Sequence, residues 1–230
     1  MRAITKFAAA AAALSLSAFA GSANAAIFIG LQQAGVDGDG AGAACVTGGI
    51  CTKATGTFGA VFAATYGSFE MELLTGTQGV DPSLLGSTTS DSNIVGGGGT
   101  LDIYVTRTDI DGPIPSAFLS TFTSNVLPTG WTVSQSTYLS TTNQLYTGTL
   151  LSSHDFAAIG TFTHVNNVAP GAGPYSVTTR YTLHAPTTGN ALSTIAIASV
   201  PEPGTWALMI TGFGGAGAML RRRRQAATAA

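Results

Sequence analysis

The sequence predicts an all-β protein, and an antiparallel β-sandwich of jelly-roll or immunoglobulin-like type fits best, with a closed barrel as the alternative. Three observations support this fold class. Short runs alternate apolar and polar residues, turn-forming clusters separate these runs, and the middle of the chain has no convincing amphipathic helix. We therefore expect eight or nine short strands in residues 26–199, flanked by an N-terminal signal helix and a C-terminal transmembrane helix.

Alternation places particular side chains in the core. We expect Phe69, Met71 and Leu73 on the buried face of one strand, with two glutamates between them facing outward. The segment 175–184 keeps the same period for longest. Residues 117–122 fit a short helical turn as an alternative to a strand. The expected strands are 26–31, 57–66, 69–73, 101–106, 130–133, 145–151, 156–165, 175–184 and 193–198.

The distribution of charge excludes one class of partner. Charged residues make up 9% of the chain, and the formal net charge is −2. Six of the nine basic residues lie in the two terminal segments, which leaves three basic against ten acidic residues between them, a net charge of −7. Because no basic patch is available to neutralise phosphates, we expect no binding to nucleic acid.

The first 25 residues have the three parts of a signal peptide. Arg2 and Lys6 supply the basic region, an apolar stretch follows, and the last three residues fit the A-x-A cleavage pattern. We expect cleavage between Ala25 and Ala26. The chain is then exported through the inner membrane into an oxidising compartment.

The exported part offers one disulfide and a weak candidate for a metal. Cys45 and Cys51 are the only cysteines, and in an oxidising compartment we expect them to pair, closing a short loop worth about 2 kcal/mol. Asp37 and Asp39 lie in a glycine-rich loop and offer oxygens to Ca²⁺. Two carboxylates are few for an ion that takes six to eight ligands, so a turn is the better interpretation. We expect no metal and no cofactor.

Catalytic residues are hard to find. His154 and Asp155 form a candidate base and orienting carboxylate, but no G-x-S-x-G turn supplies a nucleophile. We therefore expect no enzymatic activity and keep a secreted hydrolase as the second alternative.

Aromatic residues suggest carbohydrate binding or adhesion as the first alternative. Flat rings at outward strand positions form binding surfaces, although aromatic residues also simply favour strands. The candidates are Tyr66, Tyr104, Trp131, Tyr138, Tyr146, Tyr175 and Tyr181.

The C-terminal segment has the order of a stop-transfer signal. Residues 205–220 are apolar and span about 24 Å as a helix, against about 30 Å of hydrocarbon. The run contains a G-x-G-x-x-G pattern, but no acidic residue follows to hold a ribose, and small residues in a membrane helix explain the glycines better. We expect residues 225–230 to be a disordered tail. The charge that stops transfer comes from Arg221, Arg222, Arg223 and Arg224.

The same segment resembles the PEP-CTERM protein-sorting signal of Gram-negative bacteria in its PEPxxWA form. The matching residues are Pro201, Glu202 and Pro203, followed after two free positions by Trp206 and Ala207. This resemblance implies cleavage near the Pro-Glu-Pro motif by an exosortase, a membrane protease. It also implies transient contact with the membrane and association with the cell surface or the exopolysaccharide matrix.

We therefore expect three functional parts. These are a signal peptide over 1–25, an exported sandwich over 26–199 and a sorting signal over 200–224. Low charge and Ser/Thr-rich strands suit a structural protein surrounded by hydrated exopolysaccharide. Because no N-x-[ST] sequon occurs, any glycan on the chain is expected to be O-linked.

Overall fold

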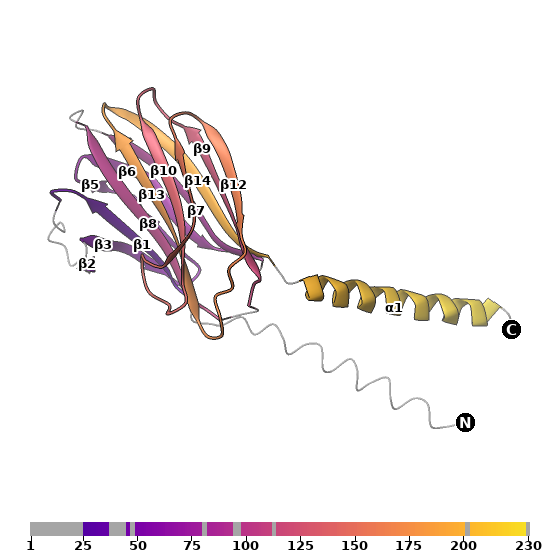
Figure 1. The fold of residues 1–230 in the computed structure, drawn as a ribbon. Helices are drawn as coiled ribbons and strands as arrows, with labels where there is room; N and C mark the ends of the chain where they lie inside the picture. Colours follow the sequence, from indigo (N-terminus) through magenta and orange to yellow (C-terminus); the bar gives the residue numbers. More distant parts are fainter. Residues whose placement is uncertain are drawn as a thin grey trace.

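Two antiparallel sheets pack face to face in the computed structural model of the chain (Figure 1). The structure describes residues 25–36, 45–46, 49–79, 82–93, 98–111, 114–200 and 203–228. The signal peptide up to residue 24, the Asp37 and Asp39 loop, and Pro201 with Glu202 lie outside these ranges, so the structure does not test the predictions about them.

The first sheet has seven strands in the order β11-β10-β13-β8-β1-β3-β2. Their bounds are β1 Ile27–Gln33, β2 Cys45–Val46, β3 Ile50–Gly56, β8 Gly99–Ile110, β10 Thr132–Ser140, β11 Thr149–Phe156 and β13 Tyr175–Ala185. The second sheet follows the order β12-β9-β14-β7-β6-β4, and β5 pairs with β6. Its strands are β4 Gly59–Phe62, β5 Thr65–Tyr66, β6 Phe69–Gln78, β7 Ser83–Asn93, β9 Ala117–Val126, β12 Gly160–Asn166 and β14 Gly189–Val200.

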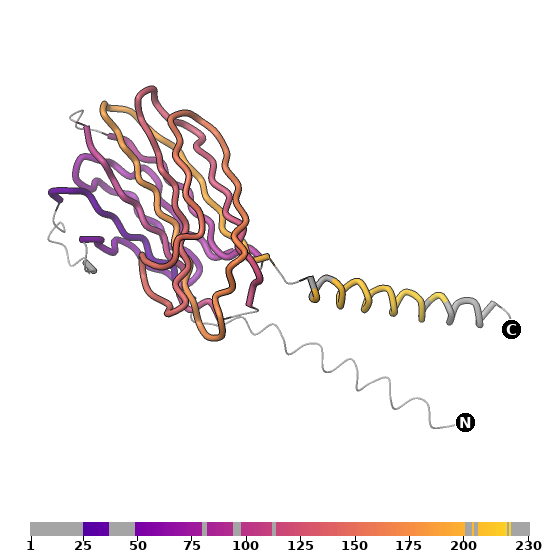
Figure 2. The backbone as a smooth tube through the Cα atoms, in the orientation of Figure 1, coloured from indigo at the N-terminus to yellow at the C-terminus, as the bar shows by residue number. Residues whose placement is uncertain are grey.

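The chain passes repeatedly from one sheet to the other. From β7 onward, successive strands alternate between the sheets, except that β10 and β11 are neighbours in the first sheet. Figure 2 shows the two layers that result. Because the strands form two separate sheets, the predicted antiparallel sandwich is confirmed and the barrel is not.

Alternation fills the space between the sheets. Leu101, Ile103 and Val105 are completely buried on the inner face of β8, as their spacing predicts. From the second sheet, Phe69 and Met71 enter the same core. The residues left between these positions form the outer faces, where a ligand or partner has access.

Two predicted details are wrong for local reasons. Residues 117–122 are not a helical turn, because their alternating burial pairs them as part of β9 between β12 and β14. Leu73 is 42% exposed, while Leu74 is buried. A register shift between Met71 and Leu73 in the pairing of β6 with β7 moves the inward position by one residue.

The C-terminal helix α1 covers Pro203–Thr228 and includes the expected helix at 205–220. It continues through the arginines to Thr228, in agreement with the helix preference of Arg, Gln and Ala. In the part of the chain that the structure describes, no helix combines the length and the apolar character needed to cross a membrane.

Candidate functional site

The outer face of the first sheet carries two adjacent cross-strand rows of hydrogen-bonding side chains. Residues in register on neighbouring antiparallel strands point to the same side, so each row follows from the pairing. We call these residues the polar face. The first row is Asp155, Ser134, Thr182, Asp102 and Gln32, and the second is Ser153, Ser136, Arg180 and Tyr104.

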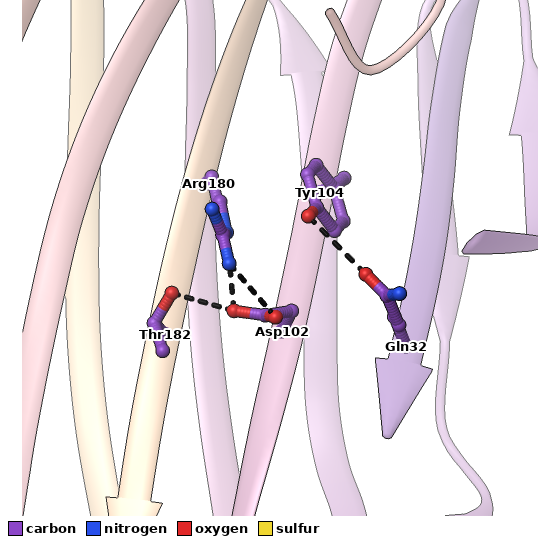
Figure 3. Close-up of polar contacts among 5 residues, drawn as sticks. All are labelled: Gln32, Asp102, Tyr104, Arg180 and Thr182. Atoms are coloured by element: carbon purple, nitrogen blue, oxygen red, sulfur yellow. Dashed lines mark hydrogen bonds and ion pairs between the residues drawn. The ribbon is translucent and has the colours of Figure 1, made fainter. Parts of the chain in front are cut away.

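An ion pair lies at the centre of the polar face. Arg180 on β13 donates from Nε to Asp102 Oδ1 at 3.1 Å and from Nη2 to Asp102 Oδ2 at 2.9 Å. Thr182 also donates its hydroxyl to Asp102 Oδ1, at 2.5 Å. Figure 3 shows both side chains reaching Asp102 from the neighbouring strand. The carboxylate is therefore fixed by three hydrogen bonds and holds the guanidinium in one plane.

Tyr104 extends this network across the sheet. Its hydroxyl donates to Gln32 Oε1 on β1 at 3.4 Å (Figure 3). The Arg180 guanidinium lies over the Tyr104 ring, 5.5 Å from its centroid. Burial raises the pKa of the Tyr104 hydroxyl, which therefore stays a neutral donor. For Arg180, burial alone would lower the pKa, but the hydrogen bonds and charge of Asp102 outweigh it and raise the pKa.

The loop 141–148 between β10 and β11 packs on this face beside Tyr104. Its Tyr146 ring meets the Tyr104 ring edge-on, with centroids 5.8 Å apart, and its hydroxyl bonds Thr52 Oγ1 at 2.7 Å. Gly30 makes this packing possible, because a Cβ there would lie 2.8 Å from Tyr146 Cζ. Tyr146 therefore closes one end of the polar face.

Backbone strain concentrates in this loop and its anchor. Within the described ranges, the residues other than glycine with positive φ are Asp109, Asn143 and Tyr146. Asn143 accepts from the Asp109 backbone N–H at 2.8 Å and donates to Asp109 Oδ1 at 2.7 Å. The Tyr146 N–H donates to Thr106 Oγ1. Strained residues of this kind persist where the surrounding structure fixes them, often at functional sites. The loop is thus a preformed wall.

Towards β10 and β11 the polar face is open. Ser134 and Ser136 are half-buried, and Ser153 and Asp155 are exposed. The Ser136 and Ser153 hydroxyls lie 3.1 Å apart across the strand pair. Hydroxyls both donate and accept, so this side offers mixed hydrogen bonds to a ligand rather than a single charge.

Most of the aromatic candidates do not reach a surface. Trp131, Tyr66, Tyr175 and Tyr181 are buried in the core, and Trp131 donates from Nε1 to Thr187 Oγ1. Tyr104 and Tyr146 are nearly buried against each other, and Tyr138 is half-buried. These candidates therefore do not form an exposed row of rings on the outer face of the first sheet. The polar rows were missed because register between distant strands is not visible in a sequence.

The candidate catalytic pair is separated by strand geometry. Asp155 lies in register with Ser134 on the outer face, whereas His154 is paired with the buried Gln135. The His154 ring stacks instead on Phe162, with centroids 4.3 Å apart. Asp155 therefore does not orient the imidazole. Among the described residues, no group of three or more His, Cys, Asp and Glu side chains is placed to hold a metal ion.

Cys51 is disulfide-bonded. Its register partner across β2 and β3 is Cys45, the other cysteine of the chain. The link is local and lies at the β2 edge of the first sheet, away from the polar face.

The sorting residues lie at the start of α1 and beyond it. Pro203 begins the helix, Ala207 is exposed on it, and Arg221 is exposed near its end. Trp206 and Arg222, Arg223 and Arg224 belong to the same helix.

Comparison with known proteins identifies this segment. Residues 199–224 match the model of the PEP-CTERM protein-sorting motif. The chain therefore carries that motif at its C-terminus. The motif implies an exported protein that is sorted to the cell surface and processed by an exosortase. No curated protein matches the chain.

Similar folds occur among solved structures. A family 35 carbohydrate binding module from Clostridium thermocellum is 14% identical, with 62% of this chain and 98% of that chain covered and a TM-score of 0.31. A carbohydrate binding module of lichenase 5A from Cellvibrio mixtus, in complex with cellotriose, is 11% identical, with 60% and 92% covered and a TM-score of 0.30. Likenesses this distant carry no argument about function.

Proposed function

We propose that the exported sandwich is a non-enzymatic protein of the cell surface or exopolysaccharide matrix that binds polysaccharide through the polar face. The sorting motif supports delivery to the surface. The two cross-strand rows around Arg180 and Asp102 support binding, because they array donors and acceptors over five neighbouring strands.

The size and stiffness of the polar face suit an extended chain. Five strands about 4.8 Å apart give a row about 19 Å long, enough for an oligosaccharide segment. The ion pair and the Tyr146 wall are fixed before binding, which lowers the entropy that a ligand must overcome.

Charge favours a neutral polysaccharide. The guanidinium of Arg180 already faces the Asp102 carboxylate, so it does not attract a second anion strongly. Asp155 adds a negative charge to the same row, and the domain carries a net charge of −7. Acidic polysaccharides are therefore expected to bind more weakly than neutral ones.

Affinity electrophoresis in gels containing exopolysaccharide from the producing cells tests this proposal. The variant Ser134→Val with Ser136→Val removes two outward hydroxyls from β10 while keeping residues that favour strands. The matched control, Thr121→Val with Thr123→Val, removes two half-buried hydroxyls from the outer face of the second sheet. We expect retardation of the wild type and of the control, and at least a tenfold loss for the β10 variant. Equal retardation of both variants would contradict the proposal.

A further inference from the structure

The second sheet ends in an edge strand that is open to pairing. β12 pairs with β9 over seven residues, without a register shift, from Gly160–Ser124 to Asn166–Phe118. Among the described residues, no strand pairs with its other edge. β12 lies at the margin of the sandwich in Figure 1. Its regular pairing with β9 leaves a straight row of backbone donors and acceptors directed outward.

The other edges of the sandwich are protected in ways that β12 is not. β2 has two residues and β4 has four, so both are short. β11 is interrupted by a register shift opposite Thr137 and Tyr138 and carries Asp155. β12 contains no Lys, Arg, Asp, Glu or Pro. Short length, charge, proline and bulges are the usual devices that prevent pairing at an edge, and β12 has none of them.

Exposed apolar side chains gather beside this edge. Val165 on β12 is 49% exposed, and Ile159 in the turn before it is 68% exposed. Burial of these side chains would add a hydrophobic contribution to the backbone hydrogen bonds of a new strand pair.

We propose that β12 pairs antiparallel with β12 of a second copy, so that two second sheets join into one continuous sheet in a two-fold dimer. Thr163 is the midpoint of β12, and a pairing centred on it uses all seven residues. Because side chains alternate along each strand, paired residues in this register point to the same side of the joined sheet. The core-facing side of one copy therefore continues into the core-facing side of the other.

The side chains of β12 are complementary to themselves in this register. Thr161 faces Val165 of the partner subunit on the outer side, and both are β-branched. Phe162 faces His164 of the partner subunit on the inner side. Within one copy, the Phe162 ring already lies parallel to those of His154 and His164, at 5° to each. The dimer extends this stack, and no like charges oppose it, which favours a second copy over a charged peptide.

A single added cysteine tests the register. In a dimer centred on Thr163, the two copies of that residue lie directly opposite, with Cβ atoms about 5 Å apart, close to disulfide geometry. Thr161 is opposite Val165 of the partner subunit, so its two copies lie about 14 Å apart and cannot be bridged. Both side chains are exposed, and Cys51 is already disulfide-bonded.

The exported protein carrying Thr163→Cys is oxidised mildly and run on a non-reducing gel beside Thr161→Cys. We expect most of the Thr163→Cys protein, and little of the control, to migrate as a covalent dimer. Equal cross-linking of the two variants would overturn the register.

Sedimentation equilibrium tests the dimer without a cross-link. We expect the wild type to sediment as a dimer, Val165→Lys as a monomer, and Val61→Lys on the opposite edge strand β4 as a dimer. Circular dichroism shows whether each variant is folded. A monomeric wild type, or a dimer lost only in Val61→Lys, would overturn the proposal.

Discussion

Arg180 and Asp102 are diagonal neighbours on adjacent strands, and each oxygen of the carboxylate accepts one hydrogen bond from the guanidinium. Because the side chains are 34% and 17% exposed, water screens the pair only in part. The charge of each is therefore useful to stability as well as to the shape of the polar face.

Asp102→Asn is expected to lower the free energy of unfolding by about 1–2 kcal/mol, since it weakens hydrogen bonds from both Arg180 and Thr182. The control, Asp155→Asn, makes the same change at an exposed position in the same row and should stay within about 0.5 kcal/mol of the wild type. Urea unfolding measures both. Equal losses would show that the ion pair has no special role.

Two substitutions of Asn143 distinguish the contribution of its hydrogen bonds from the cost of its backbone conformation. Asn143→Gly keeps the positive φ but loses both bonds to Asp109, and we expect a loss of about 1–3 kcal/mol. Asn143→Ala loses the same bonds and adds about 1 kcal/mol, because an alanine side chain disfavours that conformation. Thermal unfolding compares the two variants. An alanine variant as stable as the glycine variant would contradict a strained anchor.

Gly30 controls the position of Tyr146. In Gly30→Ala the new Cβ meets the Tyr146 ring and Ile50 Cγ2, both at 2.8 Å, so the ring must move at a cost of about 1–3 kcal/mol. In the wild type, burial raises the pKa of Tyr146 to about 12, against a smaller lowering by its bond to Thr52. We expect this pKa to fall towards 10 in the variant. Ultraviolet titration of the tyrosines measures it, when the titration of a protein that also carries Tyr146→Phe is subtracted from that of the wild type and from that of Gly30→Ala.

Gly86→Ala serves as the control for that substitution. Its Cβ would meet the Thr77 hydroxyl alone, at 3.0 Å, on the outer face of the second sheet. The Tyr146 titration should be unchanged there. If the pKa of Tyr146 in Gly30→Ala equals that in the wild type, the position of the loop does not depend on the glycine.

Asp91 makes stability depend on pH. It is buried on β7, its Oδ1 has no hydrogen-bond partner, and burial raises its pKa from 3.8 to about 7, with Thr89 donating to it and Glu72 adding repulsion. Tyr181 faces it from the first sheet. Between these two pKa values the folded state binds more protons than the unfolded state, so stability falls as the pH rises from about 4 to 7, by roughly 4 kcal/mol in total.

The comparison with Asp91→Asn isolates this effect. The difference in unfolding free energy between wild type and variant should decline over that pH range and level off above it. Urea unfolding at several pH values measures the difference. A difference that does not change with pH would contradict a neutral, buried Asp91.

Strands with clean alternation were predictable, and β7 was not. The spacing of Leu101, Ile103 and Val105 predicts β8, because apolar residues point inward and the polar residues between them point outward. On β7 the buried positions include Ser87, Thr89 and Asp91, so its inner face looks polar in the sequence. Hydrophobic period alone cannot detect a strand whose core face is made of hydroxyls and a carboxyl.

The sorting motif could be predicted from the sequence, and the polar face could not. The sorting motif is local, so Pro201 to Ala207 indicate it directly, and residues 199–224 match its model. The polar face depends on pairing that joins Arg180 to Asp102, 78 residues apart. Register of that kind is set by the whole sheet and has no local signature.

Intact-mass analysis of the chain in the washed exopolysaccharide fraction tests the central claim most directly, because it reports processing and location together. The account predicts a species that begins at Ala26 and ends near Glu202. A chain that is found only in the membrane fraction and still carries Arg221 to Arg224, in cells with an active exosortase, would contradict it.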